Sequence, residues 1–316
     1  MAKTVALLKG GWSSERPVSL MGAIGVEKAL REAGYEVRLV DVTKDLPKLV
    51  ADLTPRPDVA FNMLHGPGGE DGIIQSILEV LGIPYTHSGV RASAVAMDKI
   101  LTKRLAESVG VRCAPHTTMT LDEVRAKGID FPKPYVVKPY NEGSSFGVTI
   151  VREGDNKRFE ASEWKYGETL LIEQYIPGQE LTVAVLDGVP QTVTELKVFD
   201  GFYDYEAKYN DPRTEHILPA PVSKEVFDLA MDWSAKMYDV VGCKNLGRCD
   251  FRYDSSKPGT TGLVFLEINT HPGFTPVSLA PEQVLLKSGM NFTELCRHLV
   301  ENASCETAQT TQKAAA

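Results

Sequence analysis

Basic residues, cysteine pairs and long apolar runs are all scarce in this sequence of 316 residues. The 34 lysines and arginines are outnumbered by 42 acidic residues, so a surface that binds the nucleic-acid backbone is not expected. None of the five cysteines belongs to a CxxC pair, which argues against a disulfide framework. No segment approaches the ~18 apolar residues of a membrane span, and the apolar run before Lys9 is too short for a signal peptide. We therefore expect a cytoplasmic protein with neither a nucleic-acid nor a membrane partner.

The two common nucleotide-binding motifs are also missing. No Gly-Lys dipeptide occurs, which excludes a P-loop, and LLKGGWSSER lacks the GxGxxG of dinucleotide-binding folds. Residues 143–147 match GxSxG, which would make Ser145 a hydrolase nucleophile, but that motif requires a helix where the strand-like VTIV follows. Hydrolase chemistry is therefore not favoured, and any nucleotide must be held in another way.

The order of strand-like and helix-like segments predicts more than one domain. A chain of this length is expected to form two or three domains. The first hundred residues alternate strand and helix patterns, which favours a parallel sheet covered by helices. GGWSSER and HGPGGEDG fall at strand ends, where ligands of such sheets bind. From about Met97 short strands predominate and predict a smaller antiparallel α+β unit, before longer helices return.

Two loops could bind a nucleotide. In KPYNEGSSFGV the glycines Gly143 and Gly147 allow close approach of an anion, and Ser144, Ser145 and Lys138 add donors and charge. A plain hairpin loop explains the same composition. In LLIEQYIPGQE the backbone of residues 173–176 could face an adenine and the acid at position 180 a ribose, although an ordinary hairpin is the simpler interpretation.

Two strands near the C-terminus predict a metal site. The two-residue repeat of a strand places Arg248, Asp250 and Arg252 on one face of GRCDFRYD, and Glu267 and Asn269 on one face of FLEIN. If these strands are neighbours, Asp250, Glu267 and Asn269 form an all-oxygen site suited to Mg²⁺. A surface of salt bridges would explain the first strand but not an acid and an amide in an apolar strand. The metal interpretation is favoured.

Two histidines receive different predictions. His271 follows the oxygen ligands, but imidazole suits softer metals, so we expect it to shape a pocket. His65 stands at a strand end in a glycine-rich turn and would face the same crevice as Glu15 in a parallel sheet. It could orient a substrate, or it could be a turn histidine that is hydrogen-bonded to backbone.

Seven segments together carry a family resemblance: GGWSSERPVSL, HGPGGEDG, YTHSGVRASAVAMDK, KPYNEGSSFGV, FYDYEAKY, GRCDF and EINTHPGFTPVSL. In this order and spacing they resemble the D-alanine:D-alanine ligases of the ATP-grasp superfamily, over nearly the whole chain. The resemblance implies a mixed α/β and α+β, three-domain ATP-grasp fold. It would comprise an N-terminal parallel-sheet domain (1–98), a central ATP-grasp lid (99–178) and a C-terminal domain with the metal site (179–305), followed by a disordered tail (306–316).

The resemblance assigns the nucleotide end of the site. Lys99 and Lys138 would contact the phosphates of ATP, the loop 142–147 would close over them, and residues 173–176 with Glu180 would hold adenine and ribose. The implied ATP-binding set is Lys99, Lys138, Glu142, Gly143, Ser144, Ser145, Glu173, Gln174, Tyr175, Ile176, Glu180 and Lys208. Asp250, Glu267 and Asn269 would bind two Mg²⁺ or Mn²⁺ ions, with Glu267 bridging them.

The resemblance also assigns the amino-acid end. Glu15 would bind the ammonium group of a first D-alanine with His65 nearby, and Ser278 with Leu279 would seat the carboxylate of a second. The implied catalytic set is Glu15, Ser144, Tyr209, Arg248 and Gly273. In it, Arg248 and the Gly273 amide would stabilise an oxyanion, and Tyr209 with Ser144 would join the network around Glu15, under a lid that includes Lys208.

The reaction implied is ATP-dependent joining of two D-alanines through a D-alanyl phosphate, for peptidoglycan precursor synthesis, by a homodimer. Tyrosine at position 209 favours the dipeptide-forming type, because ligases that make D-alanyl-D-lactate generally carry phenylalanine there. Departures from the family pattern are His271 and Phe274, at variable loop positions, and Val277, where many relatives carry histidine. The alternatives are a ligase for D-lactate, D-serine or another amine, and a silent nucleotide-binding regulator, which the intact set of site residues opposes.

Overall fold

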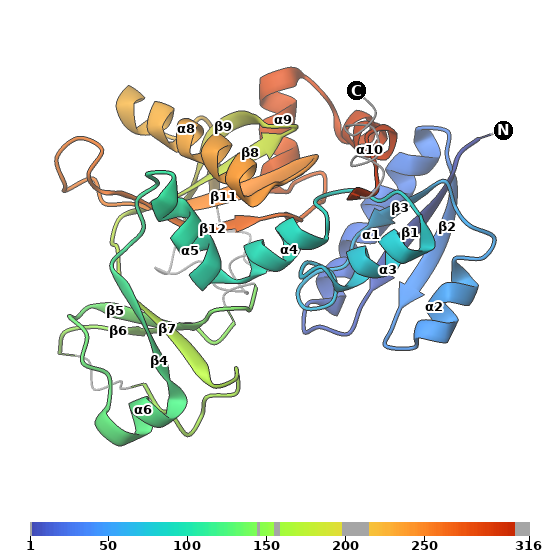
Figure 1. Cartoon of the computed structure of the whole chain (residues 1–316). Coiled ribbons are helices and arrows are strands. Elements are labelled where there is room, and N and C mark those ends of the chain that lie inside the picture. Colours follow the sequence, from blue (N-terminus) through green and yellow to red (C-terminus); the bar gives the residue numbers. More distant parts are fainter. Residues whose placement is uncertain (1, 144–145, 155–158, 198–214, 307–316) are drawn as a thin grey trace.

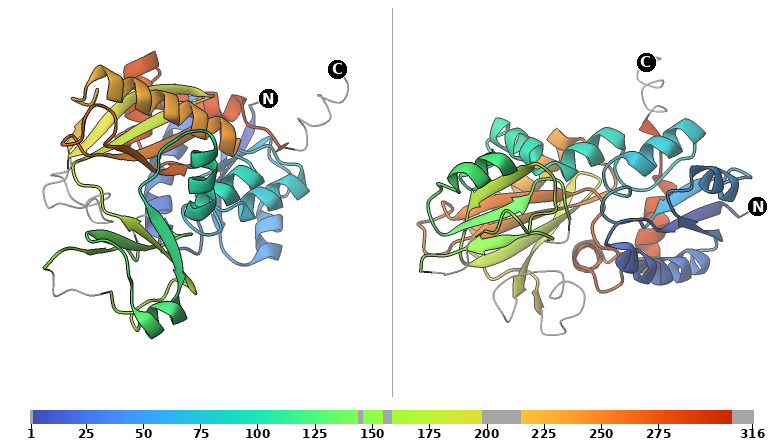
Figure 2. Two further views of the ribbon diagram at one scale, coloured as in Figure 1. Left: turned by 60° about the vertical axis from the view of Figure 1, so that its left-hand side comes forward. Right: turned by 90° about the horizontal axis from the view of Figure 1, so that it is seen from below.

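A computed structural model describes residues 2–143, 146–154, 159–197 and 215–306 of the chain. Its strands form three sheets, which follow one another along the sequence. In Figures 1 and 2 the second sheet lies beside the third, and the first lies at the other end of the molecule. No helix of the described part is long and apolar enough to cross a membrane.

The first sheet is parallel, in the order β2-β1-β3. Its elements are β1 (Thr4–Gly10), α1 (Arg16–Glu32), β2 (Glu36–Val42), α2 (Leu46–Asp52), β3 (Val59–Asn62) and α3 (Ile73–Leu81). Alternate residues of β1 enter different cores: Val5 and Leu7 pack with α1, whereas Ala6 and Leu8 pack with α2 and α3. The helices therefore cover both faces, which confirms the predicted parallel-sheet unit.

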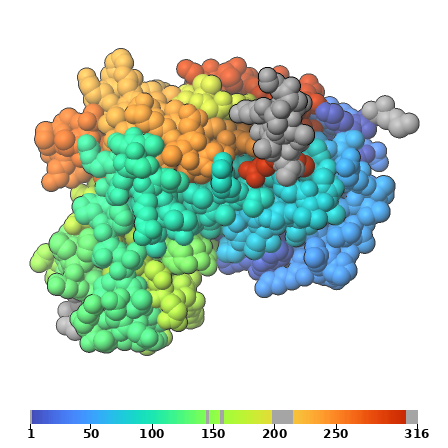
Figure 3. Space-filling view, in the orientation of Figure 1, coloured from blue at the N-terminus to red at the C-terminus, as the bar shows by residue number. Residues whose placement is uncertain are grey.

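The second sheet is antiparallel, in the order β4-β7-β5-β6. Its elements are β4 (His116–Thr120), α6 (Leu121–Lys127), β5 (Tyr135–Pro139), β6 (Thr149–Val151) and β7 (Thr169–Gln174). Helix α6 begins at a capping box in which Thr120 and Glu123 bond to each other's backbone N–H groups. A small core of its own fills this unit, which projects from the rest of the molecule in the space-filling view (Figure 3).

The third sheet is antiparallel, in the order β10-β9-β8-β11-β12. The elements of this part are α4 (Val90–Met97), α5 (Lys99–Ser108), β8 (Gln179–Leu186), β9 (Val189–Lys197), β10 (Glu215–Ile217), α8 (Lys224–Val241), β11 (Leu246–Tyr253), β12 (Leu263–Asn269), α9 (Leu279–Ser288) and α10 (Phe292–Glu301). Helices α4, α5 and α8 share the core on one face with Phe251 and Phe265. Residues of α9 and α10 pack with β8 and with the first sheet, so the two ends of the chain share a core.

The packing bears on the expected domain division. That division starts the central domain at residue 99, yet α5 packs on α8 and β12 of the third sheet. By core packing, α4 and α5 belong with the C-terminal sheet, and the division by residue number stays a prediction. The expected tail is outside the described residues except for Glu306, whose backbone N–H donates to Glu79.

Candidate active site

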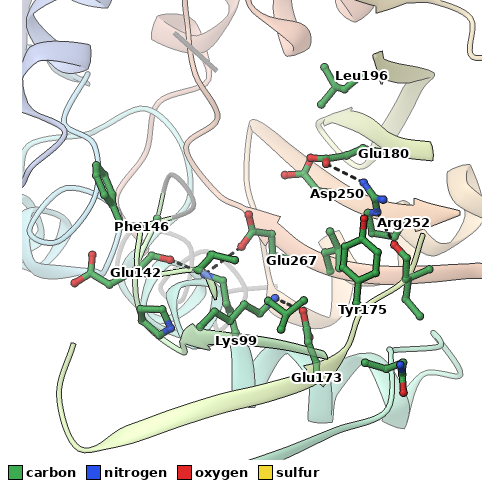
Figure 4. Close-up of a pocket in the computed structure, with 18 of the residues that line it drawn as sticks. Lys99, Glu142, Phe146, Glu173, Tyr175, Glu180, Leu196, Asp250, Arg252 and Glu267 are labelled. Atoms are coloured by element: carbon green, nitrogen blue, oxygen red, sulfur yellow. Dashed lines mark hydrogen bonds and ion pairs between the residues drawn. The ribbon is translucent and has the colours of Figure 1, made fainter. Parts of the chain in front are cut away.

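One pocket of the described structure lies between the second and third sheets (Figure 4). Strands β5 and β7 line it from one side, and β8, β11 and β12 line it from the other. It brings together the described members of the expected ATP-binding set: Lys99, Lys138, Glu142, Gly143, Glu173, Gln174, Tyr175, Ile176 and Glu180. Arg248, Asp250 and Glu267 line the same pocket. We refer to it as the nucleotide pocket.

The second pocket adjoins the first and lies against the parallel-sheet unit. It gathers the remaining described site residues: Glu15, His65, Asn269, Gly273, Ser278 and Leu279. Gly143, Arg248 and Glu267 line both pockets, so one wall is common to them. We refer to this space as the substrate pocket. Ser144, Ser145, Lys208 and Tyr209 lie outside the described residues, so their expected roles stay predictions.

The neighbouring strands β11 and β12 carry the expected metal ligands. Asp250 pairs with Glu267 and Arg248 with Asn269, so the two strands are neighbours, the condition on which the predicted metal site depends. A bulge adds Leu266 to β12 opposite the step from Asp250 to Phe251. Because one extra residue reverses the alternation of a strand, Phe265 enters the core while Glu267 faces the pocket. A regular strand would have put both on one face.

Asp250 accepts hydrogen bonds from three side chains of the site. Arg248 donates from Nε to Oδ1 (2.8 Å) and from Nη2 to Oδ2 (2.7 Å). Asn269 donates to Oδ2 (2.9 Å), and the buried Thr182 donates from Oγ1 to Oδ1 (2.7 Å). Charge-assisted bonds of this kind fix the carboxylate against the strand face. Thr182 on β8 was not foreseen, because nothing in its own sequence context marks it.

The donor set and the charge balance both fit a hard divalent cation. Carboxylate and amide oxygens are the donors that Mg²⁺ and Mn²⁺ prefer. Lys99 already places a cation beside Glu267, with Nζ 3.1 Å from Oε2, and it donates to the Glu142 carbonyl at 2.6 Å. The described lining of the nucleotide pocket holds four cationic and five acidic side chains, so a polyphosphate needs additional positive charge there.

Behind the nucleotide pocket, one carboxylate bridges two lysines. Glu173 on β7 contacts Lys138 on β5 through Oε1 and Lys103 on α5 through Oε2, the latter at 2.8 Å. Although burial raises the pKa of Glu173, the two ammonium groups lower it to about 2. Burial lowers the pKa of Lys138, and Glu173 offsets only part of that effect. Lys103 was missed from sequence; the available signal was its position four residues after Lys99, on the same helix face.

The segment expected to face adenine is more restricted than the sequence suggested. The N–H groups of Gln174 and Tyr175 donate to the carbonyls of Pro115 and Pro134, so these two amides are engaged within the protein. Arg252 holds the following turn: it donates from Nε to the Ile176 carbonyl at 3.1 Å, and its Nη1 lies 3.3 Å from the Glu180 carboxylate. Arg252 thus positions the acid expected at the ribose, a role that its place on a polar strand face did not reveal.

Glu15 brings the first unit of the molecule to the shared wall. It is the buried residue at the start of α1, and its N–H donates to Ser13, whose hydroxyl donates to the His65 carbonyl. A Cβ added at Gly143 would lie 2.7 Å from Glu15 Oε1. Only glycine permits so close an approach, so the loop of the second sheet meets this carboxylate directly.

Three histidine rings lie against one another beside the substrate pocket, and two of them, His65 and His271, line it. The ring of His271 lies 5.0 Å from that of His65 and 4.1 Å from that of His87. Burial lowers the pKa of His87 to about 3 and the pKa of His271 well below its ordinary value. Burial also opposes protonation of His65, but Glu70, 2.9 Å away, raises its pKa. His271 lines the pocket as expected, whereas His87 and Glu70 were not foreseen.

The other side of the substrate pocket is the start of α9. Ser278 caps this helix, and its Oγ accepts from the Thr275 N–H at 3.0 Å. Leu279 is the first residue of the helix, and Gly273 precedes it in the loop. Helix N-termini attract carboxylates. His216, paired with Glu282 at 2.7 Å, also lines this pocket and was not foreseen.

A nucleotide pocket between two antiparallel sheets, walled by lysines and an oxygen-donor cluster, defines an ATP-grasp enzyme. The family described as "D-ala D-ala ligase C-terminus" matches residues 105–301, and the family described as "D-ala D-ala ligase N-terminus" matches residues 46–88. The chain belongs to the D-alanine–D-alanine ligase family.

Related proteins match this chain in sequence over nearly its full length. The chain is 49% identical over 304 residues to the D-alanine–D-alanine ligase of Granulibacter bethesdensis, covering 96% of this chain and 98% of that protein. It is 49% identical to the ligase of Acidiphilium cryptum, covering 96% and 99%.

Solved structures agree with the fold. A D-alanine–D-alanine ligase from Bacillus anthracis superimposes with a TM-score of 0.77 at 28% identity, covering 98% of this chain and 100% of that one. The VanG D-Ala:D-Ser ligase from Enterococcus faecalis gives a TM-score of 0.75 at 26% identity, covering 95% and 99%.

Proposed function

We propose that this protein joins two D-alanines into D-alanyl-D-alanine at the expense of ATP, for peptidoglycan precursor synthesis. The observation that carries this proposal is the wall of Gly143, Arg248 and Glu267 common to the nucleotide and substrate pockets. It allows a phosphoryl group on one side to meet a carboxylate on the other. The full-length similarity to D-alanine–D-alanine ligases supports the same substrates.

The nucleotide lies with its phosphates at Lys99 and Lys138 and its base against residues 173–176. Glu180, held by Arg252, bonds the ribose. Asp250, Glu267 and Asn269 hold two Mg²⁺ or Mn²⁺ ions, which supply charge neutralisation for phosphoryl transfer when bound. The acidic balance of the described lining supports this need for metal.

In the first step, a carboxylate oxygen of D-alanine attacks the γ-phosphorus of ATP. The bond from that phosphorus to the bridging oxygen breaks, which releases ADP and leaves D-alanyl phosphate. Glu15 pairs with the ammonium group of this D-alanine, and His65, whose orientation Glu70 fixes, lines the same subsite. Holding both reactants across one wall replaces a bimolecular encounter by a fixed geometry.

In the second step, the deprotonated amine of another D-alanine attacks the acyl carbon, the bond from that carbon to the phosphate oxygen breaks, and phosphate leaves while the nitrogen gives up a proton to it. Arg248 and the Gly273 N–H stabilise the tetrahedral oxyanion. The N-terminus of α9, with Ser278 and Leu279, receives the carboxylate of the second D-alanine. Ser144, Tyr209 and Lys208 lie outside the described residues; by the family resemblance, Ser144 and Tyr209 would join the network around Glu15 and Lys208 would help to keep water from the acyl phosphate.

The same proposal includes a homodimer in the cytoplasm and the three-domain division given above. A ligase for D-lactate or D-serine remains the alternative chemistry, and the structural neighbour named for D-Ala:D-Ser supports keeping it as a test. The closer full-length relatives are named for D-alanine alone, which favours the dipeptide.

The test is ADP release and product mass with Mg²⁺, ATP and D-alanine as the sole amino acid. D-alanyl-D-alanine in a 1:1 ratio to ADP is the expected result. Parallel reactions add D-serine, D-lactate or L-alanine. Little turnover with D-alanine alone, restored by D-lactate or D-serine, contradicts the dipeptide assignment, and ATP binding without turnover in any mixture supports the regulator.

A further inference from the structure

Lys103 is a buried cation that stands behind the nucleotide pocket. It lies on α5 four residues after Lys99, so the two side chains share a helix face. Lys99 lines the pocket, whereas Lys103 is 0% exposed and is not among the residues that line it. A lysine is rarely buried without a strong reason, because removal of its charge from water is costly.

The partner of Lys103 is the carboxylate that also binds Lys138. Lys103 Nζ lies 2.8 Å from Glu173 Oε2, and Lys138 contacts the other oxygen of the same group. Figure 4 shows Glu173 at the base of the pocket, joined by a dashed line to a lysine of the lining. Glu173 is 3% exposed, so solvent screens these contacts little.

The charge of this cluster depends on Lys103. One carboxylate between two ammonium groups leaves a net charge of +1, and only Lys138 of the two cations faces the pocket. Without Lys103, Glu173 would balance Lys138 completely, and the cluster would offer the phosphates no net positive charge. The described lining already contains more acids than cations, so this one charge matters.

We propose that Lys103 is a positioning residue for ATP: it neutralises Glu173 from behind the pocket and thereby leaves the Lys138 ammonium to the triphosphate. This inference rests on the proposed function only for the assignment of Lys138 to the phosphates. Lys103 itself touches neither nucleotide nor substrate.

The experiment measures binding of ATP and of adenosine, each with Mg²⁺, to the intact protein by calorimetry. Lys103→Met removes the charge at similar volume, and we expect about tenfold weaker ATP binding with adenosine affinity within about twofold of the unchanged protein, since adenosine carries no phosphate. The exposed Arg104 gives a matched control on the same helix, and Arg104→Met leaves both affinities unchanged.

Two further variants separate charge from packing. Lys103→Arg keeps the cation and retains most of the ATP affinity. Lys103→Met combined with Glu173→Gln removes the buried ion pair as a unit, restores a net charge of +1 and binds ATP more tightly than Lys103→Met alone. If Lys103→Met does not fold, the double variant Lys103→Met with Glu173→Gln provides the test. The proposal is overturned if this double variant binds ATP more than about tenfold more weakly than the unchanged protein does.

Two other results also overturn it. ATP affinity that is unchanged in a folded Lys103→Met variant would show that the charge has no effect, and equal losses for ATP and adenosine would show a purely structural role. Binding needs no turnover of D-alanine. A protein whose ATP affinity depends on the charge of Lys103 but which makes no dipeptide therefore contradicts the proposed function and leaves this inference standing.

Discussion

The nucleotide pocket and the substrate pocket share one wall but are built from different chemistry. In the first, cationic side chains of the lining are matched with acids: Lys99 with Glu267, and Arg252 with Glu180. At the second, three histidine rings lie against one another, burial holds His87 and His271 neutral, and the acid Glu15 lies against Gly143. The nucleotide end should therefore respond to changes of charge, and the amino-acid end to changes of volume and ring shape.

The largest effect is expected from Glu267→Gln, at the shared wall. The variant keeps the size of the side chain but removes a charged oxygen donor, and we expect ADP formation with D-alanine to fall by about a thousandfold. Initial rates over a range of Mg²⁺ and Mn²⁺ concentrations measure this. Glu160→Gln, at an exposed position, is the matched control, and near-normal rates for Glu267→Gln refute the metal assignment.

Gly143→Ala should cost about a hundredfold in kcat/KM for D-alanine, because the new methyl group would lie 2.7 Å from Glu15 Oε1 and force the acid and the loop apart. The KM for ATP should change much less, since the methyl group points toward the amino-acid side. Steady-state kinetics with each substrate varied in turn will show the split. Equal fold changes in kcat/KM for D-alanine and in KM for ATP would mean that this wall does not separate the two pockets.

His271 tests whether ring shape matters in the substrate pocket. His271→Ala removes the middle ring of the stack, and we expect KM for D-alanine to rise about tenfold with KM for ATP unchanged. His271→Phe retains a flat ring and should lose less, because the native imidazole is held neutral. A larger loss for Phe than for Ala would show that the ring nitrogens, and not the stacking, are what the pocket requires.

The smallest effect is on stability. Burial lowers the pKa of His87 to about 3, from an ordinary value of 6.5. A depressed folded pKa means that the unfolded chain binds the proton first, so this stabilisation is complete above pH 6.5 and declines as pH falls toward 3. The loss is up to about 1.4 kcal/mol per pH unit for one imidazole.

Urea unfolding at pH 7.5, 6.5 and 5.5 measures the free energy of unfolding at each pH. His87→Phe should make this free energy fall less steeply as the pH is lowered. Glu173, at the nucleotide end, behaves differently. Its pKa is lowered to about 2, so the stability that it contributes is lost only as the pH falls below 4.5. If the free energy of unfolding falls as steeply between pH 6.5 and 5.5 in His87→Phe as in the unchanged protein, the loss of stability in this pH range does not come from the histidine stack.

The sequence predicted the features that follow from the periodicity of one strand or from the order of neighbouring strands and helices. The two-residue period of β11 placed Arg248 and Asp250 correctly on one face, and the alternation of strands and helices predicted the parallel first sheet. The bulge at Leu266 was not predictable in this way, because an inserted residue leaves the strand pattern apolar and shows itself only in pairing.

Other parts of the site arise from long-range packing. Lys103 meets Glu173 across 70 positions of the chain, and Thr182 meets Asp250 from the neighbouring strand. The placement of α5 against α8 follows from a shared apolar core, which a boundary drawn by residue number cannot reveal. Pairings of this type are fixed by the fold as a whole, so single segments carry no signal for them.

The central claim, that a carboxylate crosses the shared wall to attack ATP, is tested most directly with D-alanine labelled with ¹⁸O in its carboxylate. The attacking oxygen stays on the phosphoryl group when the amine displaces phosphate from the acyl carbon. We therefore expect each inorganic phosphate released with dipeptide to carry one ¹⁸O by mass spectrometry. Phosphate that is free of label while dipeptide accumulates would contradict the acyl phosphate and, with it, the account of the two adjoining pockets.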